Sequence, residues 1–137
     1  MFEIASRVGR LVESRPEALQ TVDDVRAFGD RFRHVVVGID APQVVICGDY
    51  RDVRVLAPDV AEQLAAMLSA ANPRVERSAV LCAADHPTAL LQLERIVRMA
   101  GNPSRRTFRE ADELAAWLGE VLTADERQRL SRFLARR

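Results

Sequence analysis

Apolar residues recur at two spacings along the chain, and each spacing predicts a different kind of element. Three segments, residues 22–39, 58–71 and 87–100, carry apolar side chains every three or four positions, which places them on one face of a helix. Two shorter runs, residues 43–48 and 75–83, are almost continuously apolar, as expected of strands that are buried on both faces. The pattern therefore predicts strands that alternate with helices.

Residues that start or stop helices mark the same boundaries. Pro58 suits the first position of the second helix, because its missing N–H group would have no helical partner there. Asn72-Pro73 is expected to end that helix, and Gly101-Asn102-Pro103 to end the third. Thr21 precedes the first helix. The apolar stretch Val35–Val37 continues the helical spacing, so we assign it to the last helical turn.

Weaker signals complete the two ends of the chain. Residues 2–6 and 8–14 favour an N-terminal hairpin, because both are short and rich in strand-forming residues. Residues 105–109 are expected to form one more short strand. Residues 110–122 and 123–135 then form two helices, and a capping box opens the second.

The predicted order is ββαβαβαβαα, which indicates an α/β fold with a central mixed sheet, covering helices and a C-terminal helical extension. A helix between two buried strands requires the strands to be parallel neighbours. We expect residues 1–122 to form the α/β domain and residues 123–137 to form an amphipathic helix that belongs to the same domain.

Length, charge and the absence of long apolar runs limit the kind of partner and the cellular location that we expect. At 137 residues the chain can bury a sizeable core without disulfides or a metal. Its formal net charge is zero, whereas nucleic-acid-binding domains carry a positive excess, so nucleic acid is not the expected partner. No apolar run has the length of a membrane span, and the first residues do not resemble a secretory signal. We therefore predict a soluble, cytoplasmic protein without stable membrane insertion.

Residues that support catalysis or metal binding are few. All 20 basic residues are arginine, which excludes Schiff-base chemistry on lysine and a lysine-containing phosphate loop. Cys47 and Cys82 lie inside apolar runs, where a thiol packs as a small hydrophobic group. The histidines, His34 and His86, form no cluster with the cysteines at metal-ligand spacing. We predict neither a metal site nor a cofactor.

Three features of the chain form a familiar combination. They are the N-terminal hairpin, the strand and loop at residues 44–51 (VVICGDYR), and residues 106–118 (RTFREADELAAWL) near the end. Together with the element order, this combination resembles the STAS domain family, and in particular its SpoIIAA-like branch, over residues 2–120. The resemblance implies a mixed α/β sheet and a role in binding other proteins, and none of the three features is a catalytic signature.

The resemblance also draws attention to the start of the helix that follows the central strand, where some members of the family carry a regulatory serine. In the family's anti-sigma-factor antagonists, a serine at the start of this helix is phosphorylated, and phosphorylation switches partner binding. The matching residues here, 53–60, contain no serine or threonine, so this switch is not expected. Asp59 places a permanent negative charge near the helix N-terminus, where it either stands in for the phosphate or simply stabilises the first turn.

Two polar loops follow the predicted central strands. Ligands bind such sheets at the carboxyl ends of the strands, so we predict a ligand-binding pocket where the loops converge. Its residues would be Asp49, Tyr50, Arg51, Asp52, Asp85 and His86. In the structural alternative, Asp85 or His86 caps the next helix, and residues 49–52 form a polar turn. His86 with Asp49 or Asp85 could also act as an acid–base pair, although no nucleophile motif accompanies them.

Charged and amphipathic segments in the last third of the chain suggest contacts with a partner. Arg95 and Arg98 begin a run of five arginines without an intervening acid, which either frames an anion site or pairs with the acidic block that follows. We predict that Asp59, Arg95 and Arg98 contact a protein partner. The last helix places Leu130, Phe133 and Leu134 on one side, and it either packs on its own domain or binds a partner, including a second copy in a homodimer.

Together, these observations favour a non-enzymatic protein-interaction or regulatory module. The alternative is a protein that binds a small ligand or anion, or acts as a weak enzyme, through a pocket at the C-terminal ends of the central strands.

Overall fold

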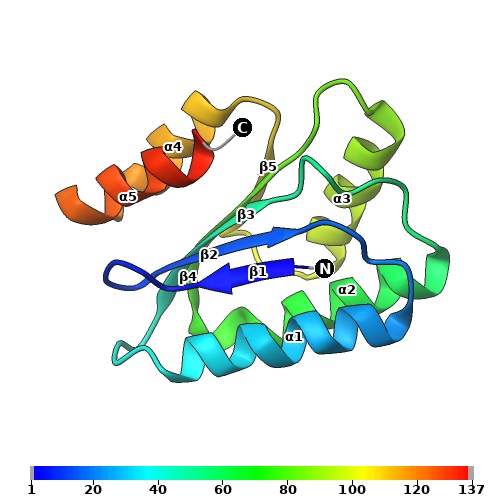
Figure 1. The fold of residues 1–137 in the computed structure, drawn as a ribbon, viewed down its shortest axis with the longest axis horizontal. Helices are drawn as coiled ribbons and strands as arrows, with labels where there is room; N and C mark the ends of the chain where they lie inside the picture. The colour runs from blue at the N-terminus through cyan, green and yellow to red at the C-terminus, as the bar shows by residue number, and fades with distance from the viewer. Residues whose placement is uncertain (1, 136–137) are drawn as a thin grey trace.

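Five strands form one sheet in the computed structural model, which describes residues 2–135 (Figure 1). In chain order they are β1 (Phe2–Ala5), β2 (Leu11–Pro16), β3 (Val44–Asp49), β4 (Val75–Leu81) and β5 (Arg105–Phe108). The strands keep this order across the sheet; β1 is antiparallel to β2, and all other neighbours are parallel. The predicted pairing of the two central apolar runs is confirmed, because Ile46 lies opposite Ser78.

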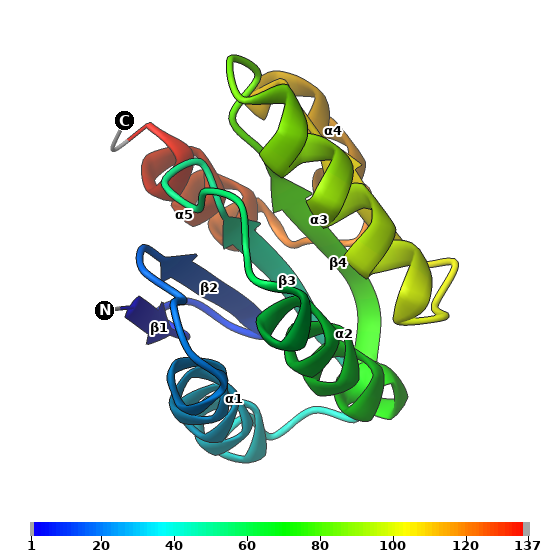
Figure 2. The same ribbon diagram turned by 90° about the vertical axis from the view of Figure 1, so that its right-hand side faces the viewer.

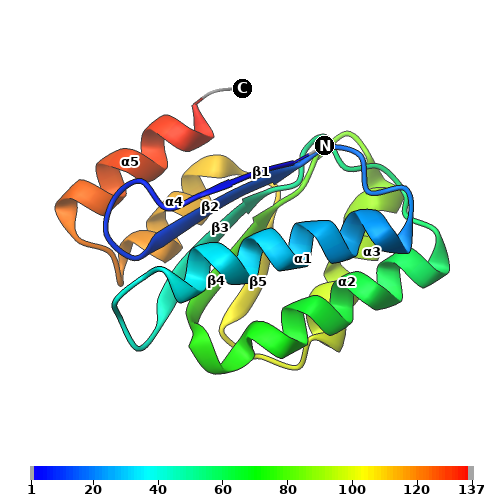
Figure 3. The ribbon, with the colours of Figure 1, turned by 60° about the horizontal axis from the view of Figure 1, so that its bottom comes forward.

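Helices cover both faces of the sheet. Those that connect the parallel strands are α1 (Val22–Val37), α2 (Pro58–Ala71), which is followed by a 3-10 turn at Asn72–Arg74, and α3 (Pro87–Met99). They lie side by side on one face (Figure 2). The chain continues into α4 (Ala111–Gly119) and α5 (Ala124–Leu134), which cover the opposite face (Figure 3). The predicted α/β fold with a mixed sheet is confirmed.

Successive residues of the central strands face the two helical layers in turn. Val44 and Ile46 belong to the core beneath α1, α2 and α3, whereas Val45 and Cys47 belong to the core beneath α4 and α5. This alternation follows from the strand geometry, in which neighbouring side chains point to opposite faces. Because both faces are covered, every residue of β3 is buried, which explains its continuous apolar run.

Local chemistry fixes the helix ends where the sequence predicted them. Thr21 caps α1, its hydroxyl accepting the Asp24 N–H at 3.1 Å while the Asp24 carboxylate accepts the Thr21 N–H at 3.0 Å. The helix runs to Val37, so the stretch Val35–Val37 is its last turn, as predicted. The capping box predicted for α5 is also present, between Thr123 and Glu126.

The hairpin turn is longer than predicted, and β2 begins at Leu11 instead of residue 8. Gly9 adopts a φ of 58°, a left-handed conformation that residues with a side chain rarely adopt. The next N–H group, that of Arg10, donates to Glu126 Oε2 at 2.8 Å and not to a strand neighbour. Glu126 lies 116 residues further along the chain, so no local pattern could predict this contact.

Candidate functional site

The two loops predicted to bind a ligand follow neighbouring strands. Asp49 lies opposite Leu81, and the Tyr50 N–H donates to the Leu81 carbonyl at 2.9 Å just beyond this pair. Among residues 2–135, however, no hydrogen bond or ion pair joins Asp49 or Arg51 to Asp85 or His86. The sheet therefore places the loops beside each other without bonding their charged side chains into one group.

Asp49 is the centre of a buried ion cluster. Its carboxylate is only 1% exposed and accepts the Arg15 Nε–H at 2.9 Å on Oδ2. Arg51 adds two further side-chain bonds, Nε to Oδ1 at 2.9 Å and Nη2 to Oδ2 at 3.0 Å. Burial would raise the pKa of Asp49, but the hydrogen bonds from Arg51 and Arg15 outweigh it and hold this pKa below its usual value. Asp49 is therefore charged at neutral pH and already paired.

The same two arginines hold the end of α5. Arg15 Nη2 donates to the Phe133 carbonyl at 2.7 Å, and its guanidinium lies 4.1 Å from the centre of the Phe133 ring. Arg51 Nη2 donates to the Leu134 carbonyl at 3.1 Å. Cations are favourable at a helix C-terminus, where the last carbonyls lack helical partners. The cluster of Arg15, Asp49 and Arg51, here called the strand-end cluster, thus ties α5 to β2 and β3.

Arg15 was not among the predicted site residues. It stands at the end of β2 and is 6% exposed, yet nothing in its sequence neighbourhood distinguishes it from a surface arginine. Only its burial in the folded protein distinguishes it, because a buried charge is stable only with an opposite charge or hydrogen-bonding groups nearby. The opposite charge comes from the Asp49 carboxylate, 34 residues away.

Tyr50 and Asp52 occupy different environments in the first loop. Tyr50 is 4% exposed and packs edge-on against Phe28, with ring centroids 6.5 Å apart, and burial raises the pKa of its hydroxyl well above the usual value. Its ring lies over Gly48, where a Cβ atom would come within 3.0 Å of Tyr50 Cδ1, so glycine makes room for it. Asp52 is half-buried. The ring of Tyr50 is thus part of the core.

Asp85 and His86 lie in the second loop, nearer to solvent. The Asp85 side chain is 85% exposed and that of His86 is 38% exposed, and Asp85 Oδ1 lies 3.8 Å from His86 Nε2. His86 occupies the N-cap position of α3 but makes no side-chain capping bond, so its imidazole is not used to start the helix. A ligand-binding role for these residues and for Asp49, Tyr50, Arg51 and Asp52 stays a prediction.

The residues predicted to contact a partner lie on the helices of the other face. Arg95 and Arg98 are exposed on the outer side of α3, and neither has an ion-pair partner among the described residues. Two large apolar side chains on the same helix, Leu91 at 65% and Met99 at 52%, are also exposed. Asp59 is exposed in the first turn of α2, where its carboxylate accepts the Val60 N–H at 2.9 Å.

A third exposed apolar residue lies beside α3. Gln92 holds the loop that leads into α2, because its amide accepts the Leu56 N–H at 2.7 Å and donates to the Leu56 carbonyl at 2.8 Å. This pair of bonds fixes the adjacent residue Val55, which is 60% exposed. We call Val55, Leu91, Arg95, Arg98 and Met99 the α3 surface.

Both thiols are buried, and their environment keeps them protonated. Burial raises the pKa of Cys47 far above its usual value, and burial together with the nearby Glu94 charge raises that of Cys82 to about 12. Within residues 2–135, no group of three or more His, Cys, Asp or Glu side chains is arranged to hold a metal ion. In the same part of the chain, no helix combines the length and the apolar character that a membrane crossing needs.

Comparison with known proteins identifies the fold. No model of a known protein family matches the chain, and no curated protein matches it in sequence. Among solved structures, it is similar to an uncharacterized protein of the DUF3478 family from Shewanella loihica PV-4, whose crystal structure is described as having a SpoIIAA-like fold. The two share 17% sequence identity with a TM-score of 0.61, and the match covers 85% of this chain and 93% of the other. The protein therefore has the SpoIIAA-like fold to which its element order and sequence motifs pointed.

Proposed function

We propose that the protein is a non-enzymatic protein-interaction module that binds its partner through the α3 surface. The observation that carries this proposal is the combination of exposed apolar side chains with two unpaired arginines on one helix. Single exposed apolar residues are common on folded proteins, but Leu91 and Met99 lie on the same helix, with Val55 next to it. Arginine and methionine are enriched at interfaces between proteins.

The charges of the surface define the partner's chemistry. Arg95 and Arg98 have no acid of their own among residues 2–135, so a carboxylate supplied by a partner would form charge-assisted hydrogen bonds with them. Leu91 and Met99 lie before and after these arginines on α3, so they call for apolar side chains on either side of those carboxylates. An amphipathic helix with apolar anchors and an acidic edge meets both requirements.

The strand-end cluster supports this proposal over the ligand-binding alternative. A ligand at Asp49 would have to displace Arg15 or Arg51 and so leave a buried charge without its partner, which costs several kcal/mol. Binding at the α3 surface displaces no internal bond. Asp59 would then contribute to the edge of the interface, and the absence of Ser and Thr from residues 53–60 makes the interaction independent of phosphorylation there.

Affinity capture from native lysate tests the proposal, with three forms of the full chain as bait. In the first variant, Leu91→Asp is combined with Arg95→Glu, which places acids where acids are expected to bind. The matched control is Arg132→Glu, at an exposed arginine on α5 at the opposite face of the sheet. We expect the wild type and the control to capture a protein that the double variant does not capture. Direct titration of that protein with the three forms of the chain then measures the loss of affinity.

Two results would contradict the interaction role. One is a set of captured proteins that is the same for all three baits. The other is turnover of a small molecule that is lost in His86→Ala and unaffected in the Leu91 variant. The predicted homodimer is addressed separately by sedimentation of the full chain and of the Arg132→Glu variant over a range of concentrations. The full chain is used because Leu130 and Phe133 of the last helix are buried on the sheet, and unchanged assembly of the variant would exclude the exposed side of this helix at Arg132 as the dimer contact.

A further inference from the structure

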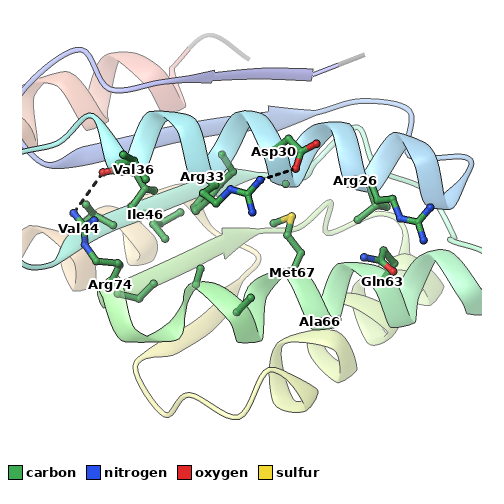
Figure 4. A pocket seen from close by; sticks show the side chains of 17 residues that line it. Arg26, Asp30, Arg33, Val36, Val44, Ile46, Gln63, Ala66, Met67 and Arg74 are labelled. Atoms are coloured by element: carbon green, nitrogen blue, oxygen red, sulfur yellow. Dashed lines mark hydrogen bonds and ion pairs between the residues drawn. The ribbon is translucent and has the colours of Figure 1, made fainter.

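A cavity of about 350 Å³ lies between α1 and α2, over the face of β3 (Figure 4). Its apolar lining comes from four elements, and includes Phe32 and Val36 on α1, Val44 and Ile46 on β3, Met67 on α2 and Val75 on β4. The volume falls within the range of about 300–1,000 Å³ that is typical of small-molecule sites, which are also mostly apolar with a few polar groups. The α3 surface and the strand-end cluster take no part in this lining.

Small residues open the space between the two helices. Ala66 and Ala70 line the cavity from α2 and are exposed at its mouth. Gly29 lines it from α1, where a Cβ atom would come within 2.9 Å of Met67 Cγ. Met67 points from α2 toward α1 in the middle of the cavity (Figure 4). Because methionine has three rotatable bonds and no branch, it can move aside for an apolar chain at little cost.

The charged residues at the rim favour an anion. Three arginines line the cavity against one acid, Asp30, which is already paired with Arg33 at 3.1 Å. Arg74 closes one end of the cavity. Its guanidinium donates to the carbonyl of Val36 in the last turn of α1, at 3.4 Å, and to that of Ala41 after the helix, at 2.8 Å. At the other end, Arg26 pairs with Asp23 at 3.3 Å, and both side chains are largely exposed. Such exposed pairs are weak, so Arg26 is available to another anion.

We propose that this cavity binds an alkyl carboxylate, with the carboxylate between Arg26 and Gln63 and the apolar chain over Met67 toward Val44. Figure 4 shows Gln63 on α2 facing Arg26, where its amide can donate a second hydrogen bond to the same head group. Arg26 and Val36 are separated by about 15 Å along α1, at 1.5 Å per residue, so an extended chain fits along the cavity. This site is separate from the proposed protein interface and does not depend on it.

Isothermal titration calorimetry of the full chain tests the proposal, with dodecanoate below its micelle concentration and dodecyltrimethylammonium as a probe of equal chain length and opposite charge. We expect dodecanoate to bind at least about tenfold more tightly. Arg26→Gln should weaken dodecanoate binding about tenfold and leave the cationic probe unaffected. Ala66→Leu, which fills the mouth of the cavity, should abolish binding of both probes.

The matched control is Ala116→Leu, the same substitution at an exposed position of α4 on the opposite face. Leucine is a good helix former, so both leucine variants should fold, which circular dichroism checks. Equal affinity for the two probes, or equal binding by the Ala66→Leu and Ala116→Leu variants, would overturn the proposal. So would a concentration-dependent increase in mass that only Ala66→Leu removes, since a second copy of the chain would then occupy the cavity.

Discussion

The two helical layers are fastened to the sheet in different ways. Polar contacts with buried groups hold α5 at three points: the strand-end cluster at its C-terminus, Glu126 at its N-terminus, and Glu13, which pairs with Arg129 at 2.6 and 2.8 Å. By contrast, the layer of α1, α2 and α3 packs on the sheet mainly through a large apolar core. A buried polar contact also attaches α2, from Arg105 of β5 to the Leu68 carbonyl at 2.9 Å, but this contact contains no carboxylate. Among residues 2–135, the exposed large apolar side chains all lie on that layer or in its loops: Val37, Val55, Leu91 and Met99.

This difference indicates which layer is rigid and which can accommodate a ligand or partner. Moving one member of a buried ion pair leaves the other charged and uncompensated, so the α4–α5 layer resists displacement. Apolar contacts are not directional, so small movements of α1 against α2 cost less. Both proposed sites, the α3 surface and the cavity beside Met67, lie in the layer without buried ion pairs.

The largest effect is expected from Asp49→Asn, which removes the charge at the centre of the rigid layer. Arg15 is 6% exposed and would lose its hydrogen-bonded carboxylate, leaving the longer contact to Glu3 at 3.8 Å, so we expect a loss of about 3–5 kcal/mol in unfolding free energy. Urea unfolding followed by the fluorescence of the single tryptophan, Trp117, measures it. Asp85→Asn, at a side chain that is 85% exposed, is the control and should stay within about 0.5 kcal/mol. Equal losses of unfolding free energy in the two variants would mean that the strand-end cluster does not stabilise the attachment of α5.

Gly9→Ala should destabilise the other end of α5. The new Cβ would overlap the Glu126 carboxylate, within 2.9 Å of its Cδ, in a backbone that is already left-handed. Glu126 would have to release the Arg10 N–H or its cap, so we expect a loss of about 2–3 kcal/mol. The control is Gly101→Ala, where φ is 73° and the space is open, with an expected loss of about 1 kcal/mol from backbone strain alone. Denaturant midpoints of the two variants should therefore differ.

Stability should also fall at acid pH through the same layer. Hydrogen bonds hold the pKa values of Asp49 and Glu126 below their usual values despite burial. Carboxylates with lowered folded pKa values stabilise the protein above their unfolded pKa of about 4, and this contribution is lost as pH falls through the folded values. Thermal melts from pH 7 to pH 3 should show the wild type and Asp49→Asn converging. A constant difference between them across this range would contradict the prediction.

The smallest effect on stability is expected at the α3 surface. Leu91→Ser and Arg95→Gln change exposed side chains that hold no internal bond, so each should alter unfolding free energy by no more than about 0.5 kcal/mol. Denaturant unfolding of both variants measures this. A loss comparable to that of Asp49→Asn would show that the surface is structural and unavailable to a partner.

Much of the fold could be predicted because its signals are local. Helix boundaries at Thr21, Pro58 and Thr123 depend on residues within one turn, and the strand pattern around Ile46 depends on its nearest neighbours. The hairpin turn was the exception: Arg10 takes its backbone partner from Glu126, at the far end of the chain. A preference that acts over a few residues cannot encode such a contact.

The candidate site could be predicted less fully. The loops of Asp49 and Asp85 were placed correctly at the ends of neighbouring strands, because parallel connection determines that position. Whether their side chains face solvent or each other depends on packing. Asp49 is enclosed because α5 returns to the same end of the sheet, and the Arg15 to Phe133 bond joins residues 118 positions apart.

The sequence by itself determined the kind and order of the elements, since spacing, caps and breakers act through neighbours in the chain. Only the tertiary structure decided that Asp49 serves the attachment of α5, that Leu130 and Phe133 pack on the sheet, and that α1 and α2 leave a cavity. These outcomes follow from which distant surfaces meet. A buried charge is satisfied, and a groove is filled or left open, only when the whole chain has folded around it.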